Sequence, residues 1–339
     1  MPLRSHHVAR WTLSLVLGLP LLAWIWLPYL LGNRRLEWEW AFGQQPHRLF
    51  LLLPVTLFLF GFSRHLRNIA WLLLVAVSLL LLLTEMTATI PWRPMTLQRD
   101  VPPVAPAWRI LTQNIDEAGP ADCLPVFCRL HPDAIVLQEL ASGNLSAWRA
   151  AVAKRGWNIH VTPLLSGSGW INTVIISPHP MKPQPALAVV NHLTGRTRYF
   201  SVVVLAKPHV PPIMLVGVQL ESVPRWAGFE AFKNSWRPRY LQAACLAAYV
   251  RQSPLPVIIA GDCNATPTDR ALEPLTQVMR DTWPQVGLGL GATFPAVTPS
   301  LRIDYLWHDP RLQSHQAARL IYEGNTSDHL ALWGDFFAL

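Results

Sequence analysis

The sequence predicts an α/β protein in which a two-sheet α/β sandwich follows an N-terminal block of transmembrane helices. Long hydrophobic runs with few charges occupy the first 92 residues. From residue 108 onward, short runs rich in Val, Ile and Leu alternate with turn residues, and two longer stretches have helical spacing. Several short runs are apolar throughout, which is typical of strands covered on both faces. We therefore expect a transmembrane region (1–92), a proline-rich linker (93–107) and a soluble domain (108–339).

Composition and charge agree with this division. Hydrophobic residues make up 51% of the 339 residues and charged residues 14%, against about 25% charged residues in soluble domains. Residues 1–106 contain nine Lys or Arg and four acidic residues, whereas 107–339 contain 19 and 16. Most of the net charge of +8 therefore belongs to the N-terminal region. The small basic excess of the soluble domain is weak support for a nucleic-acid partner, which favours a concentrated basic surface.

Three hydrophobic runs predict three membrane spans. The first, 11–31, contains 21 residues and no charge, which is enough to cross a hydrocarbon core of about 30 Å. The second (49–62) and third (69–84) are shorter and would need snorkelling Arg and His side chains or a locally thinner bilayer. Two alternatives remain open. The first run has the features of a cleaved signal peptide, and the other two are also compatible with one buried hairpin.

The expected partner of this region is a lipid bilayer, and no protein partner can be inferred. Arginines in the connecting loops are divided almost evenly between the two sides, so the positive-inside rule gives only a weak preference for orientation. Three spans with the N-terminus inside would place the soluble domain outside the cytoplasm. We therefore expect an inner-membrane protein whose soluble domain faces the periplasm.

Eight strands and two helices are expected in the soluble domain. The strands are expected at 108–115, 134–137, 172–177, 200–205, 213–220, 256–260, 303–307 and 330–336, and the helices at 121–130 and 236–251. The four cysteines do not have the spacing of a zinc site. Cys123 and Cys128 either form a disulfide or are two separate thiols.

Polar side chains lie at the ends of most of these strands. They are Asn114, Asp116, Glu139, Gln219, Asp262, Asn264, Asp304, Asp328 and His329. Carboxylate and amide oxygens, without a cluster of Cys or His, indicate Mg²⁺, with Mn²⁺ as an alternative. A His next to an Asp adds a group that can exchange protons near neutral pH. The pattern predicts one polar, metal-binding cluster at a rim of the sandwich.

The segments that carry these residues resemble the motifs of the endonuclease/exonuclease/phosphatase superfamily, in that family's order. They are NID at 114–116, LQE at 137–139, GDCN at 261–264, RIDY at 302–305 and SDH at 327–329. The resemblance covers 108–339, and the hydrophobic N-terminus makes a bacterial, membrane-anchored branch the expected one. It implies a deoxyribonuclease-like sandwich and the hydrolysis of a phosphate ester by metal-assisted attack of water.

The resemblance also implies which side chains lie near the metal. Glu139 would be the principal Mg²⁺ ligand, and Asn114 and Asp116 would lie beside it. Asp328 would lie close to both the metal and the neighbouring histidine.

The remaining polar residues would act on the phosphate and on water. By resemblance, Asp262 would orient or help deprotonate the attacking water, and Asn264 would donate a hydrogen bond to a phosphoryl oxygen. His329, oriented by Asp304, would contact the phosphate or serve as an acid or base. Together these roles describe a Mg²⁺-dependent phosphodiesterase or phosphatase whose substrate is a lipid head group, a nucleotide or a nucleic acid.

One residue departs from the family pattern. Many relatives have His-Leu after the middle strand, whereas this chain has Gln219 followed by Leu220. A glutamine can donate a hydrogen bond to a phosphate oxygen but cannot transfer a proton at neutral pH. A catalytically degenerate member that acts as a binding or scaffold protein is therefore an alternative. A nuclease is a second alternative, disfavoured by the modest positive charge.

The same residues could also have purely structural roles. Gly-Asp-x-Asn at 261–264 is favourable turn chemistry, and Asn114 could cap the end of a strand. Asp304 could pair with Arg302 or Arg311. The occurrence of all five segments in family order nevertheless favours one shared site.

Overall fold

The computed structural model describes residues 107–163, 169–191, 195, 197–222, 236–267, 269–297, 299 and 301–338. The predicted membrane spans and all but the last residue of the predicted linker lie outside the described residues. Within the described residues, no helix has the length and hydrophobicity needed to cross a membrane.

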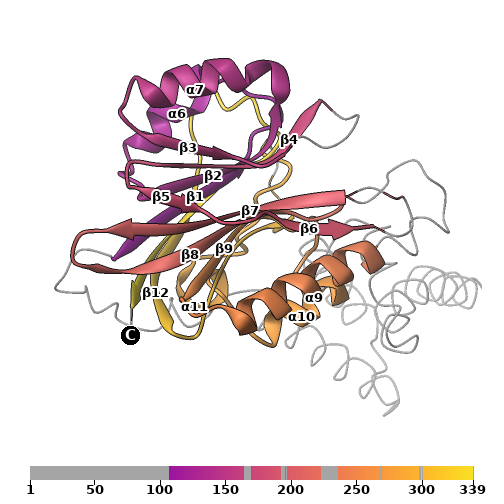
Figure 1. Cartoon of the computed structure of the whole chain (residues 1–339). Coiled ribbons are helices and arrows are strands. Elements are labelled where there is room, and N and C mark those ends of the chain that lie inside the picture. The colour runs from indigo at the N-terminus through magenta and orange to yellow at the C-terminus, as the bar shows by residue number, and fades with distance from the viewer. Residues whose placement is uncertain are drawn as a thin grey trace, which may run out of the picture. The chain divides into compact units, whose positions relative to one another are not determined.

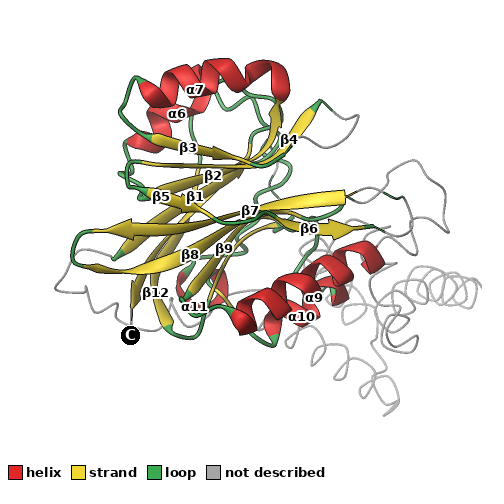
Figure 2. Cartoon of the chain, viewed as in Figure 1, coloured by secondary structure: helices red, strands yellow, loops and turns green. Residues whose placement is uncertain are grey.

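Two mixed β-sheets form the centre of the described part of the chain (Figures 1 and 2). The first has the order β12 (Leu312–Leu320), β13 (Ala331–Ala338), β1 (Trp108–Asn114), β2 (Ala134–Ala141), β4 (Trp170–Ser177), β3 (Asn158–Val161). The second has the order β10 (Arg280–Asp281), β11 (Asp304–His308), β9 (Val257–Asp262), β8 (Val210–Gln219), β7 (Thr197–Lys207), β5 (Met181–Pro183), and β6 (Leu187–Val190) pairs with β7. One neighbouring pair in each sheet is parallel, namely β1–β2 and β8–β9.

Helices lie on the outer faces of the two sheets (Figure 2). On the first sheet they are α6 (Pro120–Cys128) and α7 (Leu145–Ala153), and on the second they are α9 (Trp236–Gln252) and α10 (Glu273–Thr276). Three short helices lie in connections, namely η2 (Ser142–Asn144), η3 (Arg270–Leu272) and α11 (Trp283–Val286). The layers therefore run helix, sheet, sheet, helix.

Successive residues of the central strands point into different cores, which explains their continuous hydrophobicity. Ile110 of β1 packs between the sheets, whereas Leu111 packs with the residues of α6 and α7. In β9, Ile258 packs between the sheets and Ile259 packs with residues of α9. Strands buried on both faces favour apolar residues at every position. The structure thus confirms the predicted two-sheet sandwich with helical cover.

The structure adds elements that the sequence pattern did not indicate. They are the strands β3, β5, β6, β10 and β12, the helix α7 and the short helices η2, η3, α10 and α11. β12, at the edge of the first sheet, has the sequence LQSHQAARL and only three buried residues. An edge strand with one covered face needs few apolar residues, so its hydrophobic signal is weak. α7 has only nine residues, with Trp148 and Val152 buried one helical turn apart.

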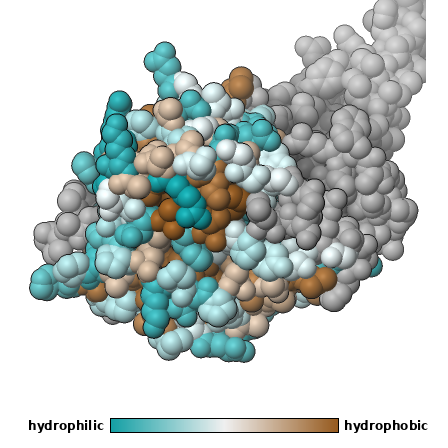
Figure 3. Space-filling view, turned by 45° about the horizontal axis from the view of Figure 1, so that its top comes forward, coloured by the Kyte–Doolittle hydropathy of each residue, from teal (hydrophilic) through white to brown (hydrophobic). Residues whose placement is uncertain are grey.

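The surface in Figure 3 is mixed, with hydrophilic residues around a smaller group of hydrophobic ones near the centre of the face shown.

All four cysteines are free thiols, so the alternative of a disulfide between Cys123 and Cys128 does not hold. Burial raises the pKa of Cys123 to about 12, as expected for a thiol in an apolar core.

Candidate active site

The parallel strand pairs of the two sheets bring the central polar side chains together. Asn114 ends β1, and Gln219 and Asp262 end the paired strands β8 and β9. Asn114 Nδ2 lies 2.9 Å from Glu139 Oε1 and 3.3 Å from Asp262 Oδ2, and it donates a hydrogen bond to each. One amide therefore links a carboxylate of the first sheet to a carboxylate of the second.

Glu139 reaches this position through an unusual backbone conformation. Its φ is 55°, a left-handed value that is uncommon for residues with a side chain and is often found at functional sites. Leu137 and Leu140 both pack in the core below α6 and α7, although residues three apart in a regular strand face opposite sides. The irregularity at Glu139 interrupts this alternation and leaves its half-buried carboxylate free to contact Asn114.

Gln219 supplies a second hydrogen bond to the same carboxylate. Its Nε2 donates to Glu139 Oε1, and the side chain is almost fully buried. The Oε1 of Gln219 accepts a hydrogen bond from Arg198 at 3.3 Å. Gln219 is thus part of the site as a hydrogen-bonding group.

Asp262 is buried and held by its near neighbour Asn264. The backbone N–H and the Nδ2 of Asn264 donate to the two carboxylate oxygens at 2.8 and 3.0 Å. The same Nδ2 also donates to the carbonyl oxygen of Leu220 at 3.1 Å, so contacts inside the protein use both of its hydrogens. The contact of Asn264 with a phosphoryl oxygen stays a prediction. Burial and the nearby charge of Asp304 raise the pKa of Asp262 to about 7.

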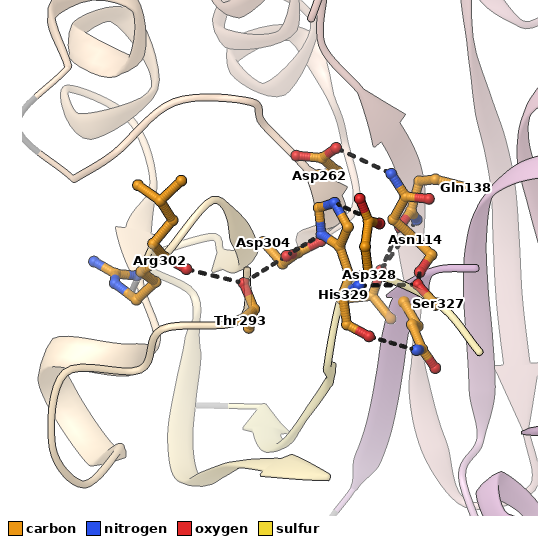
Figure 4. Close-up of polar contacts among 12 residues, drawn as sticks. Asn114, Gln138, Asp262, Thr293, Arg302, Asp304, Ser327, Asp328 and His329 are labelled. Atoms are coloured by element: carbon orange, nitrogen blue, oxygen red, sulfur yellow. Dashed lines mark hydrogen bonds and ion pairs between the residues drawn. The ribbon is translucent and has the colours of Figure 1, made fainter. Parts of the chain in front are cut away.

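His329 and Asp304 form a buried ion pair beside these groups (Figure 4). His329 Nδ1 lies 2.8 Å from Asp304 Oδ2, which also accepts a hydrogen bond from Thr293 Oγ1 at 2.5 Å. Burial alone would lower the pKa of His329, but the charge and hydrogen bond of Asp304 raise it to about 10. The imidazole is therefore protonated at neutral pH, with Nε2 left to act as a donor.

The loop that carries His329 is tied to the end of β1. Ser327 Oγ donates to the carbonyl oxygen of Asn114 at 2.6 Å and accepts from the backbone N–H of His329 at 3.0 Å. Gln113 Nε2 donates to the carbonyl oxygen of His329 at 2.8 Å. These bonds place the histidine at the same edge of the sandwich as the carboxylates.

The ion pairs of nearby arginines exclude one structural alternative. Arg302 pairs with Asp281 at 2.7 Å, and Arg311 pairs with Asp309 at 2.6 Å. Asp304 is paired with His329 rather than with either arginine.

Two predicted metal-site residues, Asp116 and Asp328, lie at the exposed border of the site. Asp116 follows β1 with φ 41°, and its backbone N–H donates to Asn114 Oδ1 at 3.2 Å. Among the described residues, none forms a hydrogen bond or ion pair with the Asp116 carboxylate. The Asp328 side chain is 48% exposed, and its Oδ1 lies 3.7 Å from His329 Nε2. Both side chains are thus exposed at this border rather than packed in the core.

The residues present fit a magnesium site with few protein ligands. In the described part of the chain, no three His, Cys, Asp or Glu side chains are arranged as a metal-binding group. Magnesium usually keeps several waters and binds one or two carboxylates together with substrate phosphate, so Glu139 with the neighbouring Asn114 amide is a suitable donor set. The site is also strongly acidic, and the buried Oδ1 of Asp304 has no hydrogen-bond partner. A cation would offset this concentration of negative charge.

Thr293 and Arg198 belong to the site but were not indicated by the sequence. Thr293 lies in a Gly- and Pro-containing connection, and Arg198 lies at the start of β7. A single Thr or Arg in such a segment has no distinctive pattern, so only the fold identifies them.

Comparison with known proteins agrees with this architecture. Residues 109–329 match the Endonuclease/Exonuclease/phosphatase family. No curated protein is significantly similar to the chain in sequence. Many solved structures are similar, among them the endonuclease/exonuclease/phosphatase from Beutenbergia cavernae, with 20% identity, a TM-score of 0.56, and coverage of 68% of this chain and 71% of that chain.

Two further similar structures are a protein with a bound anion and a protein named for its activity. The human Nocturnin catalytic domain with bound sulfate anion has 17% identity and a TM-score of 0.52, covering 68% of this chain and 94% of that chain. The Bacteroides thetaiotaomicron mannosyl-6-phosphatase has 15% identity and a TM-score of 0.52, covering 68% and 99%. At such identities, the similarity shows the fold alone. Because the family match extends over more than half of the chain, the chain belongs to the endonuclease/exonuclease/phosphatase family, whose members are metal-dependent phosphoesterases.

Proposed function

We propose that this protein is a membrane-anchored, Mg²⁺-dependent phosphoesterase that hydrolyses a phosphate ester by attack of water. The observation that carries the proposal is the meeting of two carboxylates, Glu139 and Asp262, with the ion pair of His329 and Asp304 at one edge of the sandwich. Charged groups with raised pKa values that meet at one edge from the strand ends of two sheets are typical of a functional site.

Glu139 and the Asn114 amide would hold the metal ion, with Asp116 and Asp328 at the exposed border. When bound, Mg²⁺ supplies positive charge that stabilises the negative charge developing on the phosphoryl oxygens. Glu139 is kept in place by the hydrogen bonds from Asn114 and Gln219.

Asp262 would act on the attacking water and His329 on the phosphoryl group. Asp262, with its pKa near neutrality, accepts a proton from the attacking water as the new P–O bond forms. Asn264 positions the Asp262 carboxylate through its backbone and side-chain N–H groups. His329, protonated and oriented by Asp304, donates a hydrogen bond from Nε2 to the phosphoryl group and stabilises its negative charge as the bond to the leaving group breaks.

The membrane part of the proposal depends on the hydrophobic runs of residues 1–92. Anchoring would keep the site close to a bilayer, which makes a phospholipid head group a reasonable substrate class to test. An inner-membrane location with the site on the periplasmic side is the proposed arrangement.

The proposal is tested with the full chain purified in detergent. We expect Mg²⁺-dependent hydrolysis of bis-p-nitrophenyl phosphate that EDTA abolishes, with a phospholipid and single-stranded DNA assayed in parallel. Glu139→Gln should lower kcat/KM by more than the roughly 10–100-fold that loss of a residue supporting a metal ligand costs. Glu273→Gln, at the exposed start of α10, is the matched control and should remain fully active. Metal-independent hydrolysis, or full activity of Glu139→Gln, would contradict the mechanism.

Gln219 supports one other candidate function. A glutamine cannot transfer a proton, which makes a binding or scaffold protein the alternative. A folded protein that binds Mg²⁺ but hydrolyses none of the three substrates would have that function. Preferential hydrolysis of single-stranded DNA would instead identify a nuclease.

A further inference from the structure

Arg198 makes a set of contacts that link it to the proposed metal ligand. The residue lies near the start of β7, and its side chain is only 13% exposed. Its Nε donates to Glu221 Oε2 at 3.2 Å, and one terminal nitrogen donates to Asn172 Oδ1 and Gln219 Oε1, both at 3.3 Å. Gln219 in turn donates to Glu139. The guanidinium is therefore two hydrogen bonds away from the Glu139 carboxylate.

These contacts determine which way the Gln219 amide faces. An arginine only donates hydrogen bonds and an ionised carboxylate only accepts them. The amide oxygen of Gln219 must therefore face Arg198, and its NH₂ group must face Glu139. The reversed amide would place an oxygen against the Glu139 carboxylate and N–H groups against the guanidinium. Both of those contacts are repulsive.

We propose that Arg198 is a positioning residue that orients the Glu139 carboxylate for divalent-cation binding by holding the Gln219 amide in one orientation. The inference rests on the proposed function, in which Glu139 holds the metal. Residues that hydrogen-bond a metal-ligating carboxylate influence its orientation and the affinity of the site. A glutamine suits this position because it joins an acceptor for Arg198 to a donor for Glu139.

The role depends on the shape of the guanidinium as well as on its charge. Glu221 offsets the charge of Arg198 in an ion pair whose two side chains are each 13% exposed. Glu221 is itself anchored, because its backbone N–H donates to Gln242 Oε1 on α9 at 2.8 Å. Three acceptors around one planar group fix its direction, and a lysine ammonium cannot reproduce that geometry. A chain of hydrogen bonds thus connects Glu139 to α9 through residues of β8 and β7.

The test measures the dissociation constants of Mn²⁺ and Mg²⁺ by titration calorimetry on the full chain in detergent. We expect Arg198→Met and Gln219→Leu each to weaken cation binding about tenfold. Because both act through one contact, the double variant should bind no more weakly than either single variant. Arg198→Lys should be as weak as Arg198→Met.

Arg109→Met is the matched control. Arg109 forms a two-point ion pair with Asp335, at 2.7 and 2.8 Å, near the opposite end of β1 from Asn114. Its loss should leave cation affinity unchanged. If Arg198→Met does not fold because Glu221 is left unpaired, Arg198→Met/Glu221→Gln removes both charges, and the same tenfold weakening is expected.

Wild-type affinity in the folded Arg198 variants, full restoration by lysine, or losses that multiply in the double variant would overturn the inference. Hydrolysis is measured separately. A wild-type chain that binds the cation and shows the expected affinity changes, yet hydrolyses no substrate, would refute the proposed activity and leave the positioning role standing. Mg²⁺-dependent hydrolysis together with unchanged affinity in Arg198→Met would refute only the positioning role.

Discussion

At the scale of single residues, the protonation state of His329 depends on one neighbouring carboxylate. Asp304 contacts its Nδ1 at 2.8 Å and raises the pKa of His329 to about 10. A histidine whose pKa is higher in the folded state than its unfolded value of about 6.5 stabilises the folded state, and the full stabilisation is present at pH values below the unfolded pKa. This contribution is lost as the pH rises through about 10. The charged imidazole is thus available over the whole neutral range.

Asp304→Asn should make this dependence measurable. Without the carboxylate, burial lowers the pKa of His329, so the alkaline limb of the kcat/KM profile should move to lower pH. The rate at neutral pH should fall by about 100-fold, the lower range for loss of one donor that stabilises the developing charge. The measurement is a pH profile of kcat/KM for bis-p-nitrophenyl phosphate.

Asp309→Asn is the control for this substitution. Asp309 follows the opposite end of β11 and pairs with Arg311 at 2.6 Å. Its pH profile should match that of the wild type. An alkaline limb that stays in place in Asp304→Asn would show that Asp304 does not control the charge of His329.

At the scale of elements, the close approach of β8 and β9 depends on glycine. Gly261 of β9 has φ 148°, and an added Cβ would overlap the carbonyl oxygen of Val218 on β8. On the inner face of β8, an added Cβ at Gly217 would lie 2.9 Å from Val136 Cγ1 of the other sheet. Backbone atoms cannot move aside as a flexible side chain can. The position before Asp262 therefore requires a glycine, Gly261.

Gly261→Ala should therefore damage both stability and activity. Strain and overpacking together should lower the free energy of unfolding by on the order of 3 kcal/mol, and displacement of Asp262 should lower kcat. Urea denaturation and the phosphodiester assay measure the two effects. Gly143→Ala is the control, because no heavy atom lies within 4 Å of its added Cβ. Wild-type stability of Gly261→Ala would contradict the packing argument.

At the scale of the whole molecule, the hydrophobic N-terminal region should keep the chain in a bilayer. The uncharged run at 11–31 is long enough to cross a membrane. We expect the full chain to remain in the membrane pellet after extraction with sodium carbonate at alkaline pH, which releases proteins held by charge alone. A peripheral membrane protein serves as the control. Release of the chain into the supernatant would contradict membrane insertion.

Much of the fold was predictable because both faces of its central strands are buried. The apolar run before Asp262 indicates a covered strand, and in the structure one face of this strand packs on the first sheet and the other on α9. The edge strand β12 was not predictable, because one exposed side and one hydrogen-bonded neighbour leave little hydrophobic pattern. The helix α7 was missed because nine residues with two buried side chains form a weak periodic signal.

The sequence by itself determined which polar residues stand at strand ends, from Asn114 to His329, and that their oxygen atoms suit a hard cation. Only the tertiary structure decided how those residues pair. It joined Asp304 to His329 instead of to an arginine. It also brought Arg198 within reach of Gln219. Hydrogen bonds need atoms within about 3 Å and in the right direction, and chain folding, rather than local spacing, brings residues that are tens to hundreds of positions apart to that distance.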